Sequence, residues 1–478
     1  RRGFFKEAFE LTLSSDETDV EIRYTTNGDE PSLANGNIYE TPLVIDKTTV
    51  LRAAAVKPGY KSEIATHSYF FLEDVIDQSS KPEGWPEKPV NRQVFDYGMD
   101  SKVVGKRHSR QEVIDSLRSI PTVSLTLPLD SLVGSENGIY VNALYHGRDW
   151  ERASSLEMIF PDEGKNGFQI DAGLRVRGGY TREPQFFKHG FRLFFRKQYG
   201  EGKLKYPVFG AEGADRFDNL DFRTAANHSW ARRAGRDSDP TKNTFVRDVF
   251  ARDTQGLMGH PYTRSRYYHL YLNGQYWGIY QSQERPKAAY GETYLGGKKE
   301  DYDAVKTANR VGGYATEATD GTMERWNELW RLAVAMRSNP SNETYFTMLG
   351  LDAEGKRDPE LPVLLDPENL IDYMLIIFFM GDGDAPLSGF LRFNRANNWH
   401  SLYHREGEGG FQFFCHDAEH TMDVPTAIYD RTGPFVAGQQ SQPYSNPEWI
   451  HQNLIGNPEY RMLMADRIHE HFLNDGLL

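Results

Sequence analysis

The feature that most constrains the fold is a change of pattern near residue 120. In the N-terminal part, polar and apolar residues alternate in short runs, such as 9–13 and 20–24, and Gly, Asn, Asp or Pro residues separate the runs. Alternation with period two is typical of an antiparallel β-sandwich. After residue 120 the expected elements are longer, with strands such as 411–415 beside helices such as 367–380. The sequence therefore predicts a small all-β sandwich followed by a larger α+β domain.

The length agrees with more than one domain, because 478 residues exceed the size at which a single hydrophobic core stops growing. We expect the sandwich to span residues 1–72 and the α+β domain to span residues 120–478. Between them, residues 81–89 contain several prolines, a composition that resists regular structure. Residues 73–119 are therefore expected to form a linker that packs on the larger domain, with one helix at 110–117.

Composition excludes several classes of protein. The net charge is −13, from 55 Lys and Arg against 68 Asp and Glu, so neither nucleic acid nor an anionic membrane surface is an expected partner. No apolar run reaches the roughly 18 residues that a membrane-spanning helix needs. The single cysteine, Cys415, excludes an intramolecular disulfide and any zinc site built from cysteines.

Two segments carry residues that suit phosphate binding. Arg177 precedes the pair Gly178-Gly179, and Lys188 follows just before an apolar strand. Paired glycines let backbone N–H groups approach phosphate oxygens, and a nearby lysine neutralises them. A glycine-containing hairpin with surface arginines explains the same residues. Further along, Asn273-Gly274 predicts a second hairpin, and its last strand leads to Glu284, which could either cap the next helix or bind a ligand.

An acidic loop follows the most apolar of the expected helices. It carries Asp382 and Asp384, and the stretch after it offers Asn394, Asn397 and Asn398. Carboxylates at a helix C-terminus face the negative end of the helix dipole, which is unfavourable unless a cation or a positive side chain compensates. The loop is therefore either a ligand site or an acidic turn in solvent.

A second acidic segment follows the last expected strand. Asp417 and Glu419 point to one face if the strand geometry continues, and two like charges so close are costly without a shared metal ion. His416 and His420 suit zinc poorly, because the pair follows a strand rather than lying on a helix. A hard, oxygen-liganded ion such as Mg²⁺ fits the carboxylates and Asn398 better.

Taken in order, these segments resemble the CotH (spore-coat protein H) kinase-like family over about residues 120–475. The family pattern has an Arg-Gly loop, a Lys before a strand, an Asn-Gly-x-Tyr-x-Gly-x-Tyr-x-x-x-Glu stretch, an Asp with later Asn residues, and an apolar strand that ends in Asp-x-Asp. In this sequence the matching positions are Arg177-Gly178, Lys188, Asn273 to Glu284, Asp384 with Asn397 and Asn398, and Asp417 to Glu419.

The resemblance implies an atypical protein-kinase fold that binds ATP and Mg²⁺, or Mn²⁺ in its place, and phosphorylates Ser or Thr hydroxyls of protein substrates. Lys188 would contact the α- and β-phosphates, with Arg177 near the triphosphate and Glu284 beside the nucleotide. Asp384 would orient or deprotonate the acceptor hydroxyl. The metal ligands that the resemblance implies are Asp417, Asn398 and Glu419.

Alternatives remain at the level of residues and of function. Because residues 386–392 separate the acidic loop from the asparagines, the acid could be Asp382 and the amide could be Asn394 or Asn397. A noncatalytic surface or adhesion protein could reuse the same fold. An ATP-dependent enzyme could also transfer AMP or amino acids instead of a phosphoryl group.

The N-terminal residues indicate where the protein works. Residues 5–72 resemble the small Fn3-like module at the C-terminus of chitobiase and hexosaminidase chains, through the stretches 24–31 and 51–55. That module accompanies secreted bacterial enzymes. The sequence starts at Arg1 with no initiator Met and no apolar signal region, so we expect a fragment of a precursor whose targeting segment has been removed. We therefore expect an extracellular or cell-surface protein.

Overall fold

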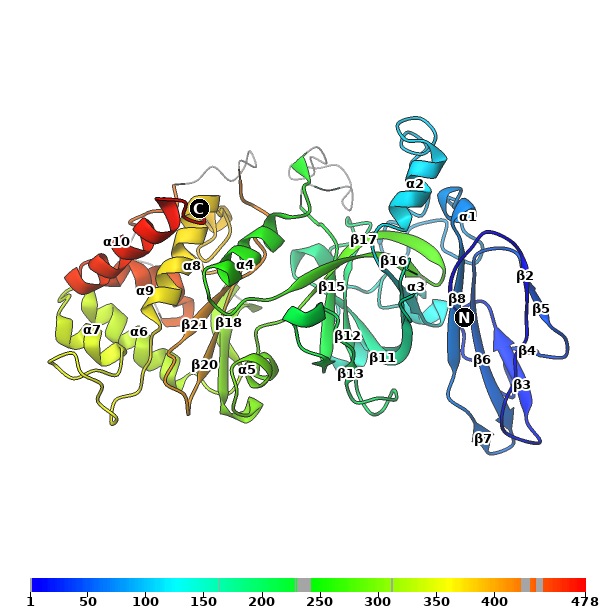
Figure 1. The fold of residues 1–478 in the computed structure, drawn as a ribbon, viewed down its shortest axis with the longest axis horizontal. Helices are drawn as coiled ribbons and strands as arrows, with labels where there is room; N and C mark the ends of the chain where they lie inside the picture. The colour runs from blue at the N-terminus through cyan, green and yellow to red at the C-terminus, as the bar shows by residue number, and fades with distance from the viewer. Residues whose placement is uncertain are drawn as a thin grey trace. The chain divides into compact units, whose positions relative to one another are not determined.

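The computed structural model describes residues 2–162, 164–227, 229, 242–310, 313–422, 430–435 and 442–478. The chain forms two compact units, seen in Figure 1. Unit 1 comprises Arg1–Thr241 and Arg266–Gln283, and unit 2 comprises Lys242–Ser265 and Glu284–Leu478. Among the described residues, no helix is both long enough and apolar enough to cross a membrane.

Unit 1 begins with a small β module. Two sheets form it, one in the order β1-β8-β6-β3-β4 with β7 paired to β6, and one of β2 with β5. Ile45, Leu51, Tyr69 and Phe71 are the buried centre of its apolar cluster. The predicted all-β module is thereby confirmed. Its strands are β1 (Gly3–Phe5), β2 (Phe9–Leu11), β3 (Glu21–Thr25), β4 (Asn37–Ile38), β5 (Leu43–Ile45), β6 (Thr49–Lys57), β7 (Tyr60–Lys61) and β8 (Ala65–Phe71).

The rest of unit 1 is built on a closed β-barrel, in the order β10-β11-β12-β15-β17-β16-β9. The pair β9–β16 is parallel, and Leu125, Phe191 and Leu270 are fully buried in the apolar cluster that the barrel encloses. A closed barrel leaves no free sheet edge among its own strands. The barrel strands are β9 (Thr122–Thr126), β10 (Arg152–Ile159), β11 (Phe168–Arg177), β12 (Gly190–Phe194), β15 (Asn219–Arg223), β16 (Ser265–Leu272) and β17 (Gln275–Gln283).

Short elements cover the barrel and connect the β module to it. Trp85 stacks on Trp277 with ring centroids 5.5 Å apart, and Gln93 donates to the carbonyl of Phe186 at 2.7 Å. On the module side, the buried carboxylate of Glu157 accepts from the Ser68 amide at 3.0 Å. The shorter elements of unit 1 are α1 (Leu72–Ile76), α2 (Arg110–Leu117), α3 (Leu129–Val133), β13 (Leu204–Lys205) and β14 (Arg216–Phe217).

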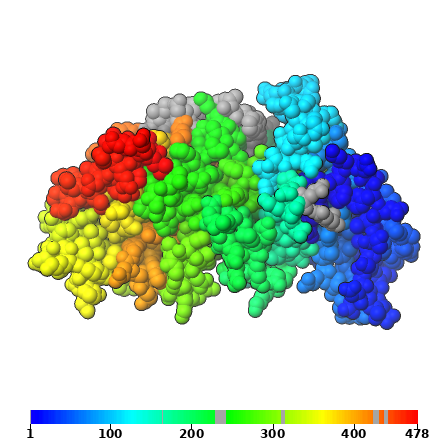
Figure 2. Space-filling model, in the orientation of Figure 1, coloured from blue at the N-terminus to red at the C-terminus, as the bar shows by residue number. Residues whose placement is uncertain are grey.

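Unit 2 combines a sheet in the order β19-β18-β20-β21 with helices, so the predicted mixed α and β content is confirmed. Helix α10 lies on the surface of unit 2 (Figure 2), and Met462 on it is 63% exposed. The strands are β18 (Tyr302–Arg310), β19 (Gly313–Asp320), β20 (Trp399–His404) and β21 (Gln412–Cys415). The helices are α4 (Arg247–Leu257), α5 (Ala288–Tyr294), α6 (Glu324–Met336), α7 (Asn342–Met348), α8 (Pro367–Met380), α9 (Pro447–Leu454) and α10 (Pro458–Phe472).

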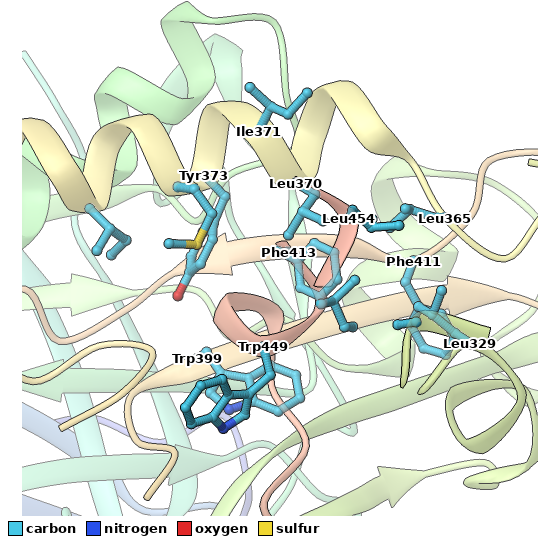
Figure 3. Close-up of a cluster of buried hydrophobic side chains, with 14 of the residues drawn as sticks. Leu329, Leu365, Leu370, Ile371, Tyr373, Trp399, Phe411, Phe413, Trp449 and Leu454 are labelled. Carbon is cyan, nitrogen blue, oxygen red and sulfur yellow. The ribbon is translucent and has the colours of Figure 1, made fainter. Parts of the chain in front are cut away.

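Helix α8 is the central element of the unit 2 core, and its sequence explains both of its ends. Asp366 caps the N-terminus by accepting from the amide of Asn369, and Pro367 occupies the first turn. Gly381 ends the helix in the left-handed conformation, with φ of 61°. In Figure 3, Leu370 and Tyr373 point from α8 toward the sheet, and Ile371 points to the other side, yet all three are fully buried. The acidic loop therefore starts from a helix that the core holds on several sides.

Candidate active site

The acidic loop after α8 is folded inward rather than into solvent. Asp382 is 1% exposed, and its Oδ1 accepts the backbone amide of Asp384 at 2.9 Å. Its other carboxyl oxygen, Oδ2, is buried without a hydrogen-bond partner. A buried carboxyl oxygen that lacks a donor is costly, so this loop is not the acidic turn in solvent that the sequence left open.

The side chain of Asp384 accepts hydrogen bonds from three other side chains. Its Oδ2 accepts from the side-chain amides of Asn397 at 2.9 Å and Asn398 at 3.0 Å, and the hydroxyl of Ser388 donates to its Oδ1. The segment between them folds back on itself, because the amide of Asn397 donates to the carbonyl of Pro386 at 2.9 Å. The asparagines therefore lie close to Asp384 although several residues separate them in the sequence. Asn397 and Asn398 both reach Asp384.

Asn398 and Asp417 lie at the same end of the β20–β21 pair. Trp399 is in register with Cys415 in this antiparallel pair, so the residues just before β20 and just after β21 are neighbours. Asn398 has φ of 48° and Asp417 has φ of 62°, a left-handed conformation that is uncommon for residues other than glycine and that Asn and Asp adopt more readily than most. Such backbone conformations cluster at functional sites.

The carboxyl groups of this site share one electrostatic environment. Burial raises the pKa of Asp384 to about 7, and the charge of Asp417 acts in the same direction. Burial also raises the pKa of Asp382 well above its usual range, with added contributions from the charges of Asp384 and Asp417. Burial raises the pKa of Tyr314 on β19, and the same two carboxylates add to that shift. A cation placed among these groups would lower the pKa values of the acids and stabilise their charged forms.

One arginine near the site was not found by sequence reasoning. Arg431 is 2% exposed and donates from Nη2 to the carbonyl of Ala385 at 3.0 Å and to Glu448 at 2.8 Å. Its guanidinium lies 4.7 Å from the centroid of the Phe393 ring. Its charge opposes the upward pKa shifts of Asp382 and Asp384. Nothing in the local sequence distinguishes this arginine, because its partners lie far along the chain.

The donor set fits a hard divalent cation completed by water or phosphate. Among the described residues, no group of three or more His, Cys, Asp and Glu side chains has the arrangement of a metal site. Mg²⁺ is usually bound by one or two carboxylates together with waters and substrate phosphates, which is a smaller demand. Asn398 uses its amide nitrogen on Asp384, so its amide oxygen is the atom available for a cation. Asp417 and Asn398 therefore fit the expected ion.

The other acids predicted for the site have partners within unit 2. The charge of Glu419 acts on Arg247, at the start of α4. Glu284 accepts from the backbone amide of Arg264 at 3.0 Å and from its side chain at 3.1 Å, and the hydroxyl of Tyr294 also donates to it. Burial raises the pKa of Glu284. The structure therefore holds Glu284 through a buried ion pair, and its place beside a nucleotide stays a prediction.

The two predicted phosphate contacts lie in unit 1. Arg177 forms an ion pair with Asp221, with Nε 3.1 Å from Oδ2. Lys188 donates to the carbonyl of Asp96 at 2.6 Å, and its ammonium lies 3.9 Å from the centroid of the Trp277 ring. Burial lowers the pKa of Lys188 to about 8. Both cations are held by contacts within unit 1, and their roles at a triphosphate stay predictions.

Two family models match parts of the chain. No curated protein matches the chain. The family model described as Fn3 associated matches residues 11–69, within the β module of unit 1. The family model described as CotH kinase protein matches residues 174–475, which is more than half of the chain and includes the acidic loop and β21. The chain therefore belongs to the CotH kinase family.

Proposed function

We propose that this protein is a CotH-type kinase that uses ATP and Mg²⁺, or Mn²⁺, to phosphorylate Ser or Thr hydroxyls of protein substrates. The observation that carries the proposal is the half-buried Asp384 carboxylate, which Asn397, Asn398 and Ser388 hold and on which the charge of Asp417 acts, in a chain of this family. Phosphoryl transfer asks a protein mainly for positioning and for neutralisation of charge. These residue types supply both.

In this proposal each acid has its own task. Three side-chain donors fix the carboxylate of Asp384, so that it can orient the acceptor hydroxyl and take its proton. Asp417 and the amide oxygen of Asn398 hold the cation, and Glu419 assists them. When bound, the cation neutralises charge on the transferred phosphoryl group.

The nucleotide contacts are the finer part of the proposal. Lys188 and Arg177 are proposed to meet the phosphates, and Glu284 to lie beside the nucleotide. Each now has a partner of its own, namely Asp96 and Trp277 for Lys188, Asp221 for Arg177 and Arg264 for Glu284. A phosphate contact therefore requires Lys188 or Arg177 to share or exchange that partner.

The test is transfer of label from ATP to a Ser-rich acceptor or to the protein itself, in the presence of Mg²⁺. We expect transfer by the unaltered protein, and a loss of at least about 100-fold in Asp417→Ala, because the developing charge loses its main stabiliser. Asp466→Asn, on the surface helix α10, is the matched control and should transfer normally.

Two outcomes would contradict the proposal. Absence of transfer from the unaltered protein, without any thermal stabilisation by ATP and metal, would indicate a noncatalytic protein that reuses the fold, because a ligand that binds the native state must stabilise it. Modified products whose intact mass corresponds to AMP or an amino acid would indicate a different transferase.

We also propose that the protein works outside the cell or at the cell surface. The support is the Fn3-associated module at residues 11–69, together with its resemblance to modules of secreted bacterial enzymes. Detection of the intact protein in the culture medium or on washed, unbroken cells tests this setting. Recovery only after cell lysis would contradict it.

A further inference from the structure

The outer edge of strand β21 is paired with side chains instead of with another strand. β21 is the last strand in the order β19-β18-β20-β21 of the described residues. On its outer edge, the amide of Phe413 donates to Oδ1 of Asn369 on α8, and the amide of Cys415 donates to Oε1 of Gln255 on α4 at 2.9 Å. The carbonyl of Phe413 accepts from Nε2 of the same Gln255. Two helix side chains therefore supply the hydrogen bonds that a neighbouring strand would supply.

The attachment to α4 continues past the strand. The amide of Ala418 donates to Oδ1 of Asp248 at 3.2 Å. The other oxygen of Asp248 pairs with Arg252 at 3.0 Å, and this fully buried arginine donates to the carbonyl of Thr263 at 2.6 Å and to the hydroxyl of Ser265 at 2.6 Å. Asp248 is thus itself held in place by a buried network.

These two attachments lie on either side of Asp417. Cys415 comes two residues before it and is held by Gln255, and Ala418 comes directly after it and is held by Asp248. Asp417 adopts the left-handed conformation, with φ of 62°, which is uncommon for a residue other than glycine. Like charges on Asp382 and Asp384 also act on it. The two hydrogen bonds fix the backbone on either side of this residue.

We propose that Gln255 and Asp248 are positioning residues for the metal-binding carboxylate, so that helix α4 sets where the side chain of Asp417 meets the cation. The inference rests on the proposed function, because it assumes that Asp417 binds the metal. Residues that orient metal ligands typically change metal affinity by about 10-fold to 100-fold when they are mutated. Neither Gln255 nor Asp248 needs to touch the ion.

Unit 1 contains a matched control for Gln255. Gln169 on β11 donates to the carbonyl of Ile64 at 3.3 Å and accepts from the amide of Thr66 at 3.1 Å. Gln255 makes the same contact with the carbonyl of Phe413 and the amide of Cys415, two residues apart in the chain. Gln255→Ala and Gln169→Ala therefore remove the same kind of bond, but only the first removes it beside Asp417.

The experiment measures Mn²⁺ binding to the nucleotide-free full chain by electron paramagnetic resonance, with thermal unfolding recorded in parallel. We expect Gln255→Ala to weaken Mn²⁺ binding by about 10-fold or more, and Gln169→Ala to leave it within about 2-fold. Asp248→Asn keeps an oxygen for the amide of Ala418, so it should weaken binding less than Gln255→Ala does. If Gln255→Ala does not fold, Gln255→Met takes its place, since it fills a similar volume and supplies neither hydrogen bond.

The outcomes separate this inference from the proposed function. In one outcome the unaltered protein binds Mn²⁺ while Gln255→Ala and Gln169→Ala have the same effect on that binding, whether none or an equal loss. That outcome overturns the positioning role alone. Absence of Mn²⁺ binding by the unaltered protein, both without nucleotide and with ATP present, overturns both the metal site and the role of α4. Loss of binding in Gln255→Ala but not in Gln169→Ala supports the inference.

Discussion

The paired acids of unit 1 and the acidic loop of unit 2 hold their carboxyl groups in different ways. In unit 1, Asp221 is paired with both Arg177 and Arg192, and Glu157 is paired with Arg2. In unit 2, the loop after α8 instead holds Asp384 with amides and a hydroxyl, and one oxygen of Asp382 has no partner. Paired charges suit a stable scaffold, whereas acids held without an ion-pair partner suit the metal site that we propose. Under the proposed function, the contrast separates structural acids from functional ones.

The largest loss of stability is expected at Asp221, which pairs with two arginines. Asp221→Asn would leave Arg177 and Arg192 facing each other at a position where the aspartate is 4% exposed. We expect a loss of about 3 to 5 kcal/mol in the free energy of unfolding, because the remaining charges are left without compensation. Denaturant titration of the purified protein measures it.

A control within the same unit defines the size of that effect. Lys205 and Glu201 form a pair that is 64% and 66% exposed, and Glu201→Gln should change the free energy of unfolding by less than about 1 kcal/mol. If both variants lose equally little, the idea that unit 1 depends on complementary charge is wrong.

The next largest effect is expected when His451, in the interior of unit 2, becomes protonated. His451 is 6% exposed, its Nδ1 lies 2.7 Å from the hydroxyl of Tyr460, and burial lowers its pKa to about 4. A histidine whose folded pKa lies below its unfolded value of about 6.5 contributes stability above that pH and loses it as the pH falls toward 4. We expect a loss of up to about 3 kcal/mol across this window.

Unfolding titrations at several pH values, compared with those of His451→Gln, test this expectation. The variant should lack the acid-dependent loss that His451 causes, whereas replacement of the exposed His108 by Gln should leave the loss intact. Parallel pH curves for the unaltered protein and His451→Gln would show that the interior of unit 2 accepts the charge.

The smallest effect is expected at Asp382, which has one carboxyl oxygen without a hydrogen-bond partner. Burial raises the pKa of Asp382 well above its usual range, so its ionised form is disfavoured in the folded state. Stability from such a group is present at low pH and is lost as the pH rises through the folded pKa. Asp382→Asn keeps an oxygen for the amide of Asp384, and we expect it to stabilise the protein increasingly with rising pH, by about 1 kcal/mol. Thermal unfolding between pH 6 and 9 measures it, and destabilisation that grows with pH would contradict the contrast drawn above.

Local patterns explain what the sequence predicted well. The helix expected at 367–380 is found as α8, because Pro367 and Gly381 mark its two ends. The turn Asn273-Gly274 joins β16 to β17 as its hairpin signal indicates. Residue types alone also indicate a candidate site at the acidic loop and at the segment after β21. Each of these features depends on neighbours in the chain.

Features that depend on distant residues could not be predicted in this way. The parallel pair β9–β16, which closes the barrel, joins residues 122–125 to residues 269–272. Gln255 meets the backbone of β21 across 158 residues of chain. A side chain that hydrogen-bonds a strand edge leaves no periodic signal, and an arginine such as Arg431 is ordinary until its partners are known. Neither the barrel nor the role of α4 was therefore expected.

The return of residues 266–283 to unit 1 governs how the protein can be made and divided. A ribosome must synthesise the chain through Gln283 before the barrel can close, so the first unit cannot finish folding until part of the second, α4, has already emerged. A gene fragment that stops at residue 241 would encode a barrel without β16 and β17, with the edges of β9 and β15 open to aggregation. The two units are therefore best expressed as one chain.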